Sequence, residues 1–108
     1  MKHFYNASEL LLFLDALSNP YRLKIIVSLK KETQYVSQLA RNLDISRALL
    51  YLHLKKLEEA NIVRSKMELL ESGKSAKFYS LNSFDFSINE SIIESLILKE
   101  EQNKEDNY

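Results

Sequence analysis

Residues 36–63 read VSQLARNLDISRALLYLHLKKLEEANIV, and this stretch decides the fold class. Apolar residues at helical spacing after the capping serine Ser37 predict a short helix over residues 38–43. A tight link and a second capping serine, Ser46, then precede a longer predicted helix over residues 47–60. A short helix, a tight link and a longer second helix are the parts of a helix-turn-helix.

A β-hairpin is predicted directly after the longer helix. Asn61 ends that helix, because asparagine is the usual substitute for glycine in the left-handed position that follows a helix. Two β-prone runs follow, over residues 62–70 and 76–81, around a turn that contains the one glycine of the chain, Gly73. Two such runs joined by a glycine-containing turn indicate a hairpin, which would lie beside the helix-turn-helix as a wing.

Two helices, over residues 8–17 and 20–31, are predicted before the quoted stretch. Ser8 or Asn6 can cap the first, and Asn19 before Pro20 is typical of the start of the second. In the second helix the predicted buried stripe is Leu23, Ile26 and Val27, and the basic residues left outside are Arg22, Lys24, Lys30 and Lys31.

The remaining segments complete the predicted order of elements. Residues 33–36 are β-prone, and apolar residues from Ile88 to Ile97 predict a final helix. The order is then helix, helix, strand, helix, helix, hairpin and helix, a mainly α winged helix-turn-helix with a small β-hairpin. We expect a single domain over residues 1–98, including the terminal helices, and an acidic, disordered tail over residues 99–108.

Composition excludes several classes of function. The absence of cysteine removes disulfides, thiol catalysis and thiolate metal sites. The two histidines, His3 and His53, have no partners at ligand or catalytic spacing, and we expect His53 to be a structural or phosphate-side residue. We therefore expect no enzyme activity, no metal and no cofactor. No apolar run is long enough to span a membrane, and the first ten residues lack the basic-then-apolar pattern of a secretory signal, so we expect a cytoplasmic protein.

Charge is distributed unevenly along the chain although the net charge is zero. Residues 20–31 carry a charge of +4 and residues 41–77 a charge of +3, whereas residues 78–108 carry −5. A basic middle and an acidic end are a reason to look for a nucleic-acid-binding face.

Four segments resemble one family of regulators. Residues 17–26, LSNPYRLKII, resemble the L-x-x-P-x-R-[LI]-x-I-[LI] segment of the ArsR-like (arsenical-resistance repressor) winged-helix family. Residues 36–40 resemble its V-x-[ED]-L-A segment, and residues 45–63 resemble its L-S…H-L-x-x-L-x-x-A-G-[LI]-[VI] core. Residues 77–81, KFYSL, are similar to its wing strand.

The resemblance covers residues 10–98 and implies a dimeric, cytoplasmic, prokaryotic transcription regulator whose first and last helices form the dimer interface. The chain departs from the family at three places. It lacks the cysteine pair of the metal-sensing members, which argues against metal sensing there, and Asn61 replaces the usual glycine. Ala48, Leu49 and Leu52 partly replace the small polar residues that commonly open the second helix.

The helical period predicts which side of the second helix is available to DNA. With Leu50, Leu54 and Leu57 inward, Ala48, Leu52 and Lys55 point outward. Arg47 is suited to a guanine edge, and Ala48 and Leu52 to thymine methyl groups. The predicted DNA-binding residues, which include the helix starts and the wing, are Ser37, Gln38, Ser46, Arg47, Ala48, Tyr51, Leu52, Lys55, Lys56, Lys74, Ser75 and Lys77. The alternatives are that Arg47 is a solvated charge, that Tyr51 packs beneath the wing and that the hairpin is simply solvated.

The terminal helices contain more apolar residues than a small core can cover. We expect one stripe of them to face a second copy of the chain, the alternative being that both helices pack only on their own core. The predicted interface residues are Leu10, Phe13, Leu14, Leu17, Ile88, Ile92, Leu96 and Ile97. A twofold pair would match a palindromic site in double-stranded DNA.

The sequence thus favours a dimeric, sequence-specific DNA-binding regulator that acts as a repressor, with a small-molecule effector left open. A competing hypothesis is a winged-helix module that binds protein through the apolar patch formed by Leu49 and Leu52.

Overall fold

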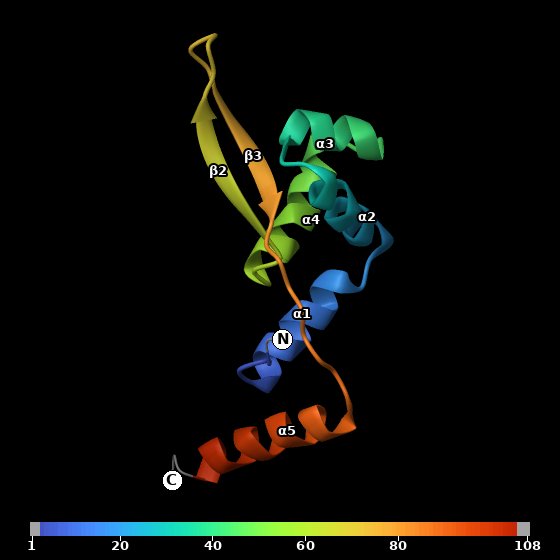
Figure 1. Cartoon of the computed structure of the whole chain (residues 1–108), viewed down its shortest axis with the longest axis vertical. Coiled ribbons are helices and arrows are strands. Elements are labelled where there is room, and N and C mark those ends of the chain that lie inside the picture. Colours follow the sequence, from blue (N-terminus) through green and yellow to red (C-terminus); the bar gives the residue numbers. More distant parts are fainter. Residues whose placement is uncertain (1–2, 106–108) are drawn as a thin grey trace.

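The computed structural model describes residues 3–105 and has the predicted order of elements (Figure 1). The elements are α1 (Ala7–Leu17), α2 (Pro20–Lys31), β1 (Gln34–Tyr35), α3 (Val36–Leu43), α4 (Arg47–Glu59), β2 (Val63–Leu69), β3 (Ser75–Leu81) and α5 (Glu90–Glu105). The prediction of a winged helix-turn-helix is confirmed.

The hairpin belongs to a three-stranded antiparallel sheet with the strand order β1-β3-β2. β2 pairs with β3 from Val63↔Leu81 to Leu69↔Ser75, so the predicted hairpin is confirmed. β1 adds to the other edge of β3 through Gln34↔Tyr79 and Tyr35↔Phe78, a pairing that the local pattern did not predict.

The core lies where α2, α3 and α4 meet the base of the sheet. Leu50, Leu54 and Leu57 of α4 are fully buried, which confirms the predicted stripe. The stripe predicted for α2 is wrong for Leu23, which is 49% exposed, and for Val27, which is 58% exposed, whereas Ile26 is half-buried against the core. The buried side of α2 instead contains Ile25 and Leu29 together with Arg22, which is 7% exposed.

Side-chain caps set where most of the helices begin. Asn6 Oδ1 accepts a 2.8 Å hydrogen bond from the Glu9 N–H, so α1 begins before Ser8. Asn19 and Ser46 cap α2 and α4 as predicted. α3 begins at Val36 rather than after Ser37, because Gln38 Oε1 accepts a 3.0 Å hydrogen bond from the Tyr35 N–H.

The last helix differs from its prediction at both ends. Ile88 precedes α5, whose first turn is capped by a 2.9 Å hydrogen bond from the Ile92 N–H to Asn89 Oδ1. The helix continues through residues 99–105, where the sequence predicts a disordered tail, and residues 106–108 lie outside the described residues. Lys99 attaches this part to the first residues, because its Nζ donates a 2.9 Å hydrogen bond to Tyr5 O and lies 4.2 Å from the centre of the Tyr5 ring.

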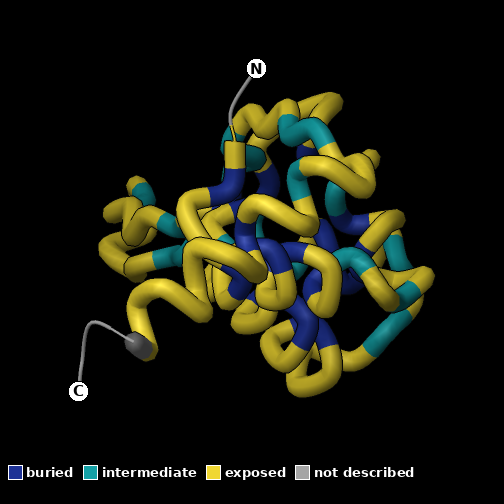
Figure 2. Tube along the Cα trace, turned by 90° about the horizontal axis from the view of Figure 1, so that it is seen from below, coloured by how far each residue is buried: buried dark blue, intermediate teal, exposed yellow. Residues whose placement is uncertain are grey.

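The molecule is elongated, with extents of 57 × 27 × 25 Å. α5 packs against α1 at the end opposite the tip of the wing (Figure 1). The radius of gyration is 17.2 Å, whereas a compact domain of this length has about 13 Å. Figure 2 shows the buried segments gathered at the centre and α5 exposed along most of its length. A single chain therefore leaves α5 largely uncovered.

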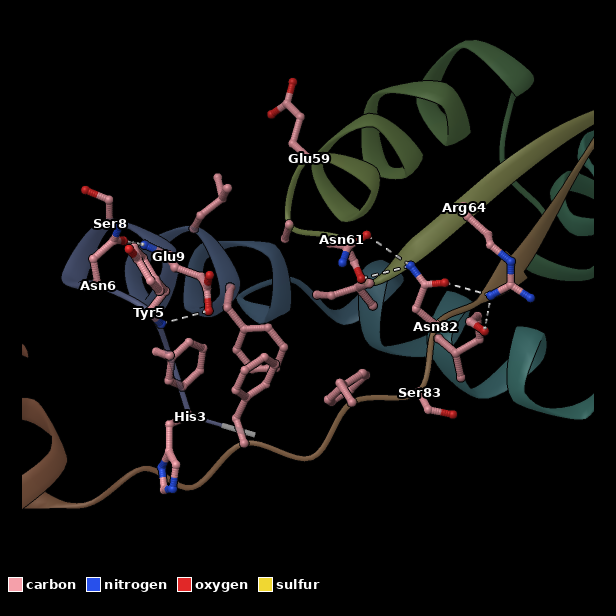
Figure 3. Close-up of a pocket in the computed structure, with 18 residues that line it drawn as sticks. His3, Tyr5, Asn6, Ser8, Glu9, Glu59, Asn61, Arg64, Asn82 and Ser83 are labelled. Atoms are coloured by element: carbon pink, nitrogen blue, oxygen red, sulfur yellow. Dashed lines mark hydrogen bonds between the residues drawn. The ribbon is translucent and has the colours of Figure 1, made fainter. Parts of the chain in front are cut away.

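The turn from α4 into β2 depends on a left-handed residue. Asn61 has a φ of 59°, as the sequence predicts. Asn82 Nδ2 donates to Asn61 O at 3.0 Å and to Asn61 Oδ1 at 3.3 Å, which ties the end of the hairpin to this turn (Figure 3). A Cβ is unfavourable in this conformation, and asparagine tolerates it better than most residues do.

A pair of substitutions tests the left-handed turn. Asn61→Ala and Asn61→Gly both remove the side-chain amide, but only alanine places a strained Cβ there. We expect Asn61→Ala to be less stable than Asn61→Gly by about 1 kcal/mol, or about 4–8 °C in the melting temperature. Thermal unfolding followed by circular dichroism measures the difference, and equal melting temperatures would contradict the prediction.

Candidate nucleic-acid interface

The link between α3 and α4 is short and fixed by the backbone. Asp44 ends α3 in the left-handed conformation, with a φ of 54°, and its N–H donates to Arg41 O at 3.2 Å. The Ile45 N–H donates to Ala40 O at 3.1 Å, and Ser46 Oγ then accepts a 3.1 Å hydrogen bond from the Leu49 N–H. Three residues, 44–46, therefore separate α3 from α4, a link as short as a helix-turn-helix requires.

One side of α4 is open to solvent between α3 and the wing (Figure 1). In its first two turns, the side opposite the buried leucines presents the side chains of Arg47, Ala48, Tyr51 and Leu52. Leu52 is 65% exposed, the largest exposed fraction among the apolar side chains of α4. The predicted DNA-binding residues exposed on this helix are Arg47, Ala48, Tyr51, Leu52, Lys55 and Lys56.

Lys56 has a partner that the sequence did not reveal. Its Nζ forms a 2.9 Å ion pair with Asp15 Oδ2 on α1. The ion pair also holds the pKa of the Asp15 carboxyl below its usual value. Lys56 thus faces the terminal helix, on the other flank of α4 from Tyr51, and is less available to DNA than Lys55.

A shallow pocket between α4 and β3 joins the helix to the wing. Tyr51, Lys55 and Glu58 line it from the helix, and Lys77 and Tyr79 line it from the strand. Lys77 Nζ lies 5.5 Å from the centre of the Tyr79 ring, and a hydrogen bond with Tyr79 raises the pKa of Lys77, which keeps the ammonium group charged. Tyr51 lies beside the wing while remaining substantially exposed, so both of its predicted roles remain open.

The wing tip is a tight turn with a cation next to the glycine. Gly73 has a φ of 85°, its N–H donates to Leu70 O at 2.9 Å, and the Leu70 N–H donates to Lys74 O at 2.8 Å. Lys74 is exposed, and Ser75 is the first residue of β3 rather than part of the turn. Lys66, exposed on β2, adds a cation that the sequence analysis did not single out, although strand alternation places it on one face with Arg64.

The predicted residues at the start of α3 have unequal exposure. Ser37 is half-buried within the first turn of the helix, whereas Gln38 is exposed. Because Gln38 uses its carbonyl oxygen to accept the Tyr35 N–H, its amide NH₂ remains outward as a hydrogen-bond donor.

The predicted dimer residues divide into two groups. Leu10, Phe13 and Leu96 are buried within the same chain, and Leu17 and Ile92 are half-buried against the core. Leu14, Ile88 and Ile97 are exposed. Phe13 belongs to an aromatic cluster with Phe4, Phe84 and Phe86, in which the Phe4 and Phe86 rings stack with centres 4.2 Å apart.

A cavity lies over this aromatic cluster, at the junction of the first turn of α1, the end of α4 and the segment before α5 (Figure 3). Its polar wall contains Asn61, Asn82 and Arg64, whose Nη1 donates to Asn82 Oδ1 and to Leu81 O. The cavity therefore touches both the end of α4 and the base of the wing.

A buried contact behind α4 was missed in the sequence. Arg22 Nη1 lies 3.1 Å from His53 Nδ1, and its other nitrogens donate to backbone carbonyls of α1. Burial and the nearby guanidinium lower the pKa of His53. His53 is structural, as expected, but Arg22 was predicted to point outward because basic residues usually do.

The described residues contain neither a metal-binding cluster nor a membrane-spanning helix. Within residues 3–105, no group of three or more histidine, aspartate or glutamate side chains is arranged to hold a metal ion. Among the same residues, none of the helices has the length and apolar character needed to cross a membrane.

The chain matches known regulators. Residues 19–65 match the model of the family described as "Bacterial regulatory protein, arsR family". The uncharacterized HTH-type transcriptional regulator MJ0229 of Methanocaldococcus jannaschii is 40% identical over 86 residues, which cover 80% of this chain and 90% of that protein.

Solved structures share the fold of this chain. NolR from Sinorhizobium fredii is 32% identical, with a TM-score of 0.62 over 88% of this chain and 84% of that one. The homodimeric winged helix-turn-helix DNA-binding domain of Mb0332 from Mycobacterium bovis shares the fold at 17% identity, with a TM-score of 0.61 over 92% of this chain and 82% of that one. The chain belongs to the ArsR family of helix-turn-helix transcriptional regulators.

Proposed function

We propose that this protein is a dimeric, sequence-specific DNA-binding repressor without enzymatic activity. The observation that supports it best is the open face of α4, which combines Arg47, Tyr51 and Lys55 beside a wing that bears Lys74 and Lys77. A helix of this kind enters the major groove with its first turns against the bases, and the wing lies along the backbone.

Base reading falls to the first two turns of α4. Arg47 has the fork of donors that matches the O6 and N7 acceptors of guanine, the commonest specific contact in the major groove. Ala48 and Leu52 offer apolar groups to thymine methyls, and Tyr51 has a hydroxyl within reach of the groove edge. Contact with a thymine methyl group gives a role to the exposed side chain of Leu52.

Phosphate contacts position the protein without selecting sequence. Ser46 and the free N–H groups at the start of α4 suit a phosphate, as Gln38 and Ser37 do at the start of α3. Lys74, Ser75 and Lys77 on the wing suit the backbone of the adjacent strand.

Dimerisation is supported by the uncovered end of the molecule. α1 and α5 expose Leu11, Leu14, Ile93, Ile97 and Leu98 at the end away from the wing tip. A monomer of ordinary compactness would not leave a 16-residue helix packed chiefly against one neighbour. A twofold pair through these helices presents two copies of α4 about 34 Å apart, one turn of DNA, which suits a palindromic operator. Mb0332, which shares the fold, is described as homodimeric.

Repression follows from occupancy of the promoter. An effector would act by changing the spacing of the two α4 helices. The cavity over the aromatic cluster supports such a role for a small molecule with both apolar and polar groups, since a molecule bound there contacts the end of α4 and the start of β2. Native mass spectrometry of the purified protein tests for such a ligand, and a mass equal to the bare dimer in every preparation argues against it.

Substitution of Arg47 tests base reading. We expect Arg47→Ala to weaken binding to the chain's own promoter region about tenfold and to relax the preference for one base pair. Lys30→Ala removes the same charge from an exposed site on α2 and serves as the control, with an unchanged affinity.

Substitution of Lys74 tests the phosphate contact. Lys74→Ala should leave the sequence preference intact and reduce the slope of log Kd against log salt concentration by about one.

Fluorescence anisotropy at several salt concentrations measures these effects. If no duplex binds and Arg47→Ala changes nothing, the protein-binding alternative through Leu49 and Leu52 is favoured, and pull-down with Leu52→Ser as the comparison tests it directly.

A charge in α5 tests the dimer. Ile97 is 44% exposed, so Ile97→Glu should fold and should shift the protein from dimer to monomer in analytical ultracentrifugation. Met67→Glu, an apolar-to-acid change at a position on the wing that is 58% exposed, should leave the dimer intact. A wild-type protein that sediments as a monomer at all concentrations contradicts the proposed assembly.

A further inference from the structure

The junction of α1, α2 and α4 contains a buried guanidinium and a buried imidazole in direct contact. From α2, Arg22 Nε donates to Ala16 O at 2.7 Å and Nη2 donates to Asp15 O at 3.1 Å. These carbonyls belong to the last turn of α1, where a cation is favourable. Arg22 Nη1 lies 3.1 Å from Nδ1 of His53 on α4. One side chain thus connects the helix proposed to form the dimer to the helix proposed to read DNA.

The contact requires a neutral His53. Arginine keeps its charge at every pH that a protein tolerates and has only donors, so Nδ1 must be the acceptor and the ring proton must be on Nε2. A protonated imidazole has donors at both nitrogens. Protonation of His53 therefore replaces the hydrogen bond from Arg22 with a contact between two positively charged side chains.

The groups around His53 come from α1, α2 and α4. From α2, Tyr21 stacks on the His53 imidazole with ring centres 5.7 Å apart. Lys24 Nζ, also from α2, lies 5.6 Å from the centre of the Tyr21 ring. From α1, the Asp15 carboxylate is engaged by Lys56 of α4 at 2.9 Å. Burial and Arg22 lower the pKa of His53, in agreement with this arrangement.

We propose that Arg22 and His53 are positioning residues that fix α4 relative to α1, and that uptake of a proton from solvent by His53 Nδ1 releases α4 and weakens DNA binding. The inference rests on the proposed function, in which α4 contacts DNA and α1 contacts the second copy. Each dimer contains two such contacts, because each chain contributes one.

The direction of the pH effect follows from the lowered pKa. Above the ordinary histidine pKa of about 6.5, His53 is neutral and the contact is complete. As the pH falls below that value the unfolded chain binds the proton first, so the stability contributed by the contact decreases, and below the folded-state pKa the contact is lost. Simple electrostatics predicts the opposite for DNA binding, because protonation makes the whole chain more positive.

The experiment compares the two histidines of the chain. Affinity for the promoter duplex is measured from about pH 8 to pH 5 at constant ionic strength for wild type, His53→Asn and His3→Gln. Asparagine places an acceptor near the position of Nδ1 and does not titrate. We expect wild type and His3→Gln to lose at least tenfold in affinity over this range. We expect His53→Asn to retain its affinity or bind more tightly at acid pH.

Equal pH profiles for wild type and His53→Asn overturn the proposal, as does an unchanged or stronger wild-type affinity at acid pH. Two measurements on the protein without DNA distinguish failure of the proposed role of Arg22 and His53 from failure of the proposed DNA-binding function. NMR of the wild-type imidazoles gives the pKa of His53 directly, and a value at or above 6.5 overturns the proposal even if the asparagine variant does not fold.

The second measurement uses the absence of native cysteine. A spin label on Leu52→Cys reports the distance between the two α4 helices, which should change as His53 titrates and stay fixed in the His53→Asn background. A distance that is constant with pH overturns the positioning role. Absence of binding to any duplex at any pH, with the distance change present, overturns the DNA-binding proposal alone.

Discussion

The burial of Leu50, Leu54 and Leu57 determines most of the architecture. Three leucines at helical spacing can be removed from water only if one side of α4 faces the core, so the opposite side must face solvent. α3 and the base of the sheet cover the apolar side, and α2 packs behind it. The orientation of the polar face is thus a consequence of hydrophobic packing, whichever molecule it meets.

Local signals made a large part of the fold predictable. Asn19, Ser46 and Asn61 act through their own backbone neighbourhood, and the structure has each of them at the helix boundary that the sequence indicated. The pairing of β1 with β3 joins residues that are distant in the chain, and no local pattern encodes it. The extent of α5 was underestimated because Lys99 is held by Tyr5, at the other end of the sequence.

The predicted site was limited by what a helical period can show. Periodicity identified the exposed residues of α4, but it does not reveal a partner from another helix, such as Asp15 for Lys56. It also misassigned Arg22, because composition treats arginine as a surface residue and takes no account of the free carbonyls at the end of α1. On α1, it did not distinguish Leu10 and Phe13, which are covered within the chain, from Leu14, which is exposed.

The attachment of α5 to α1 has a consequence for how the protein responds to its own abundance. Because a single chain gives this helix little to pack against, burial of its exposed side in the proposed dimer would be linked by mass action to protein concentration. If the proposed dimer forms through α1 and α5, dilution that separates the two subunits would uncover these helices, and a duplex with two adjoining half-sites would bring the subunits together. Occupancy of such a duplex by the proposed dimer would then depend more steeply on protein concentration than the binding of a preassembled protein would.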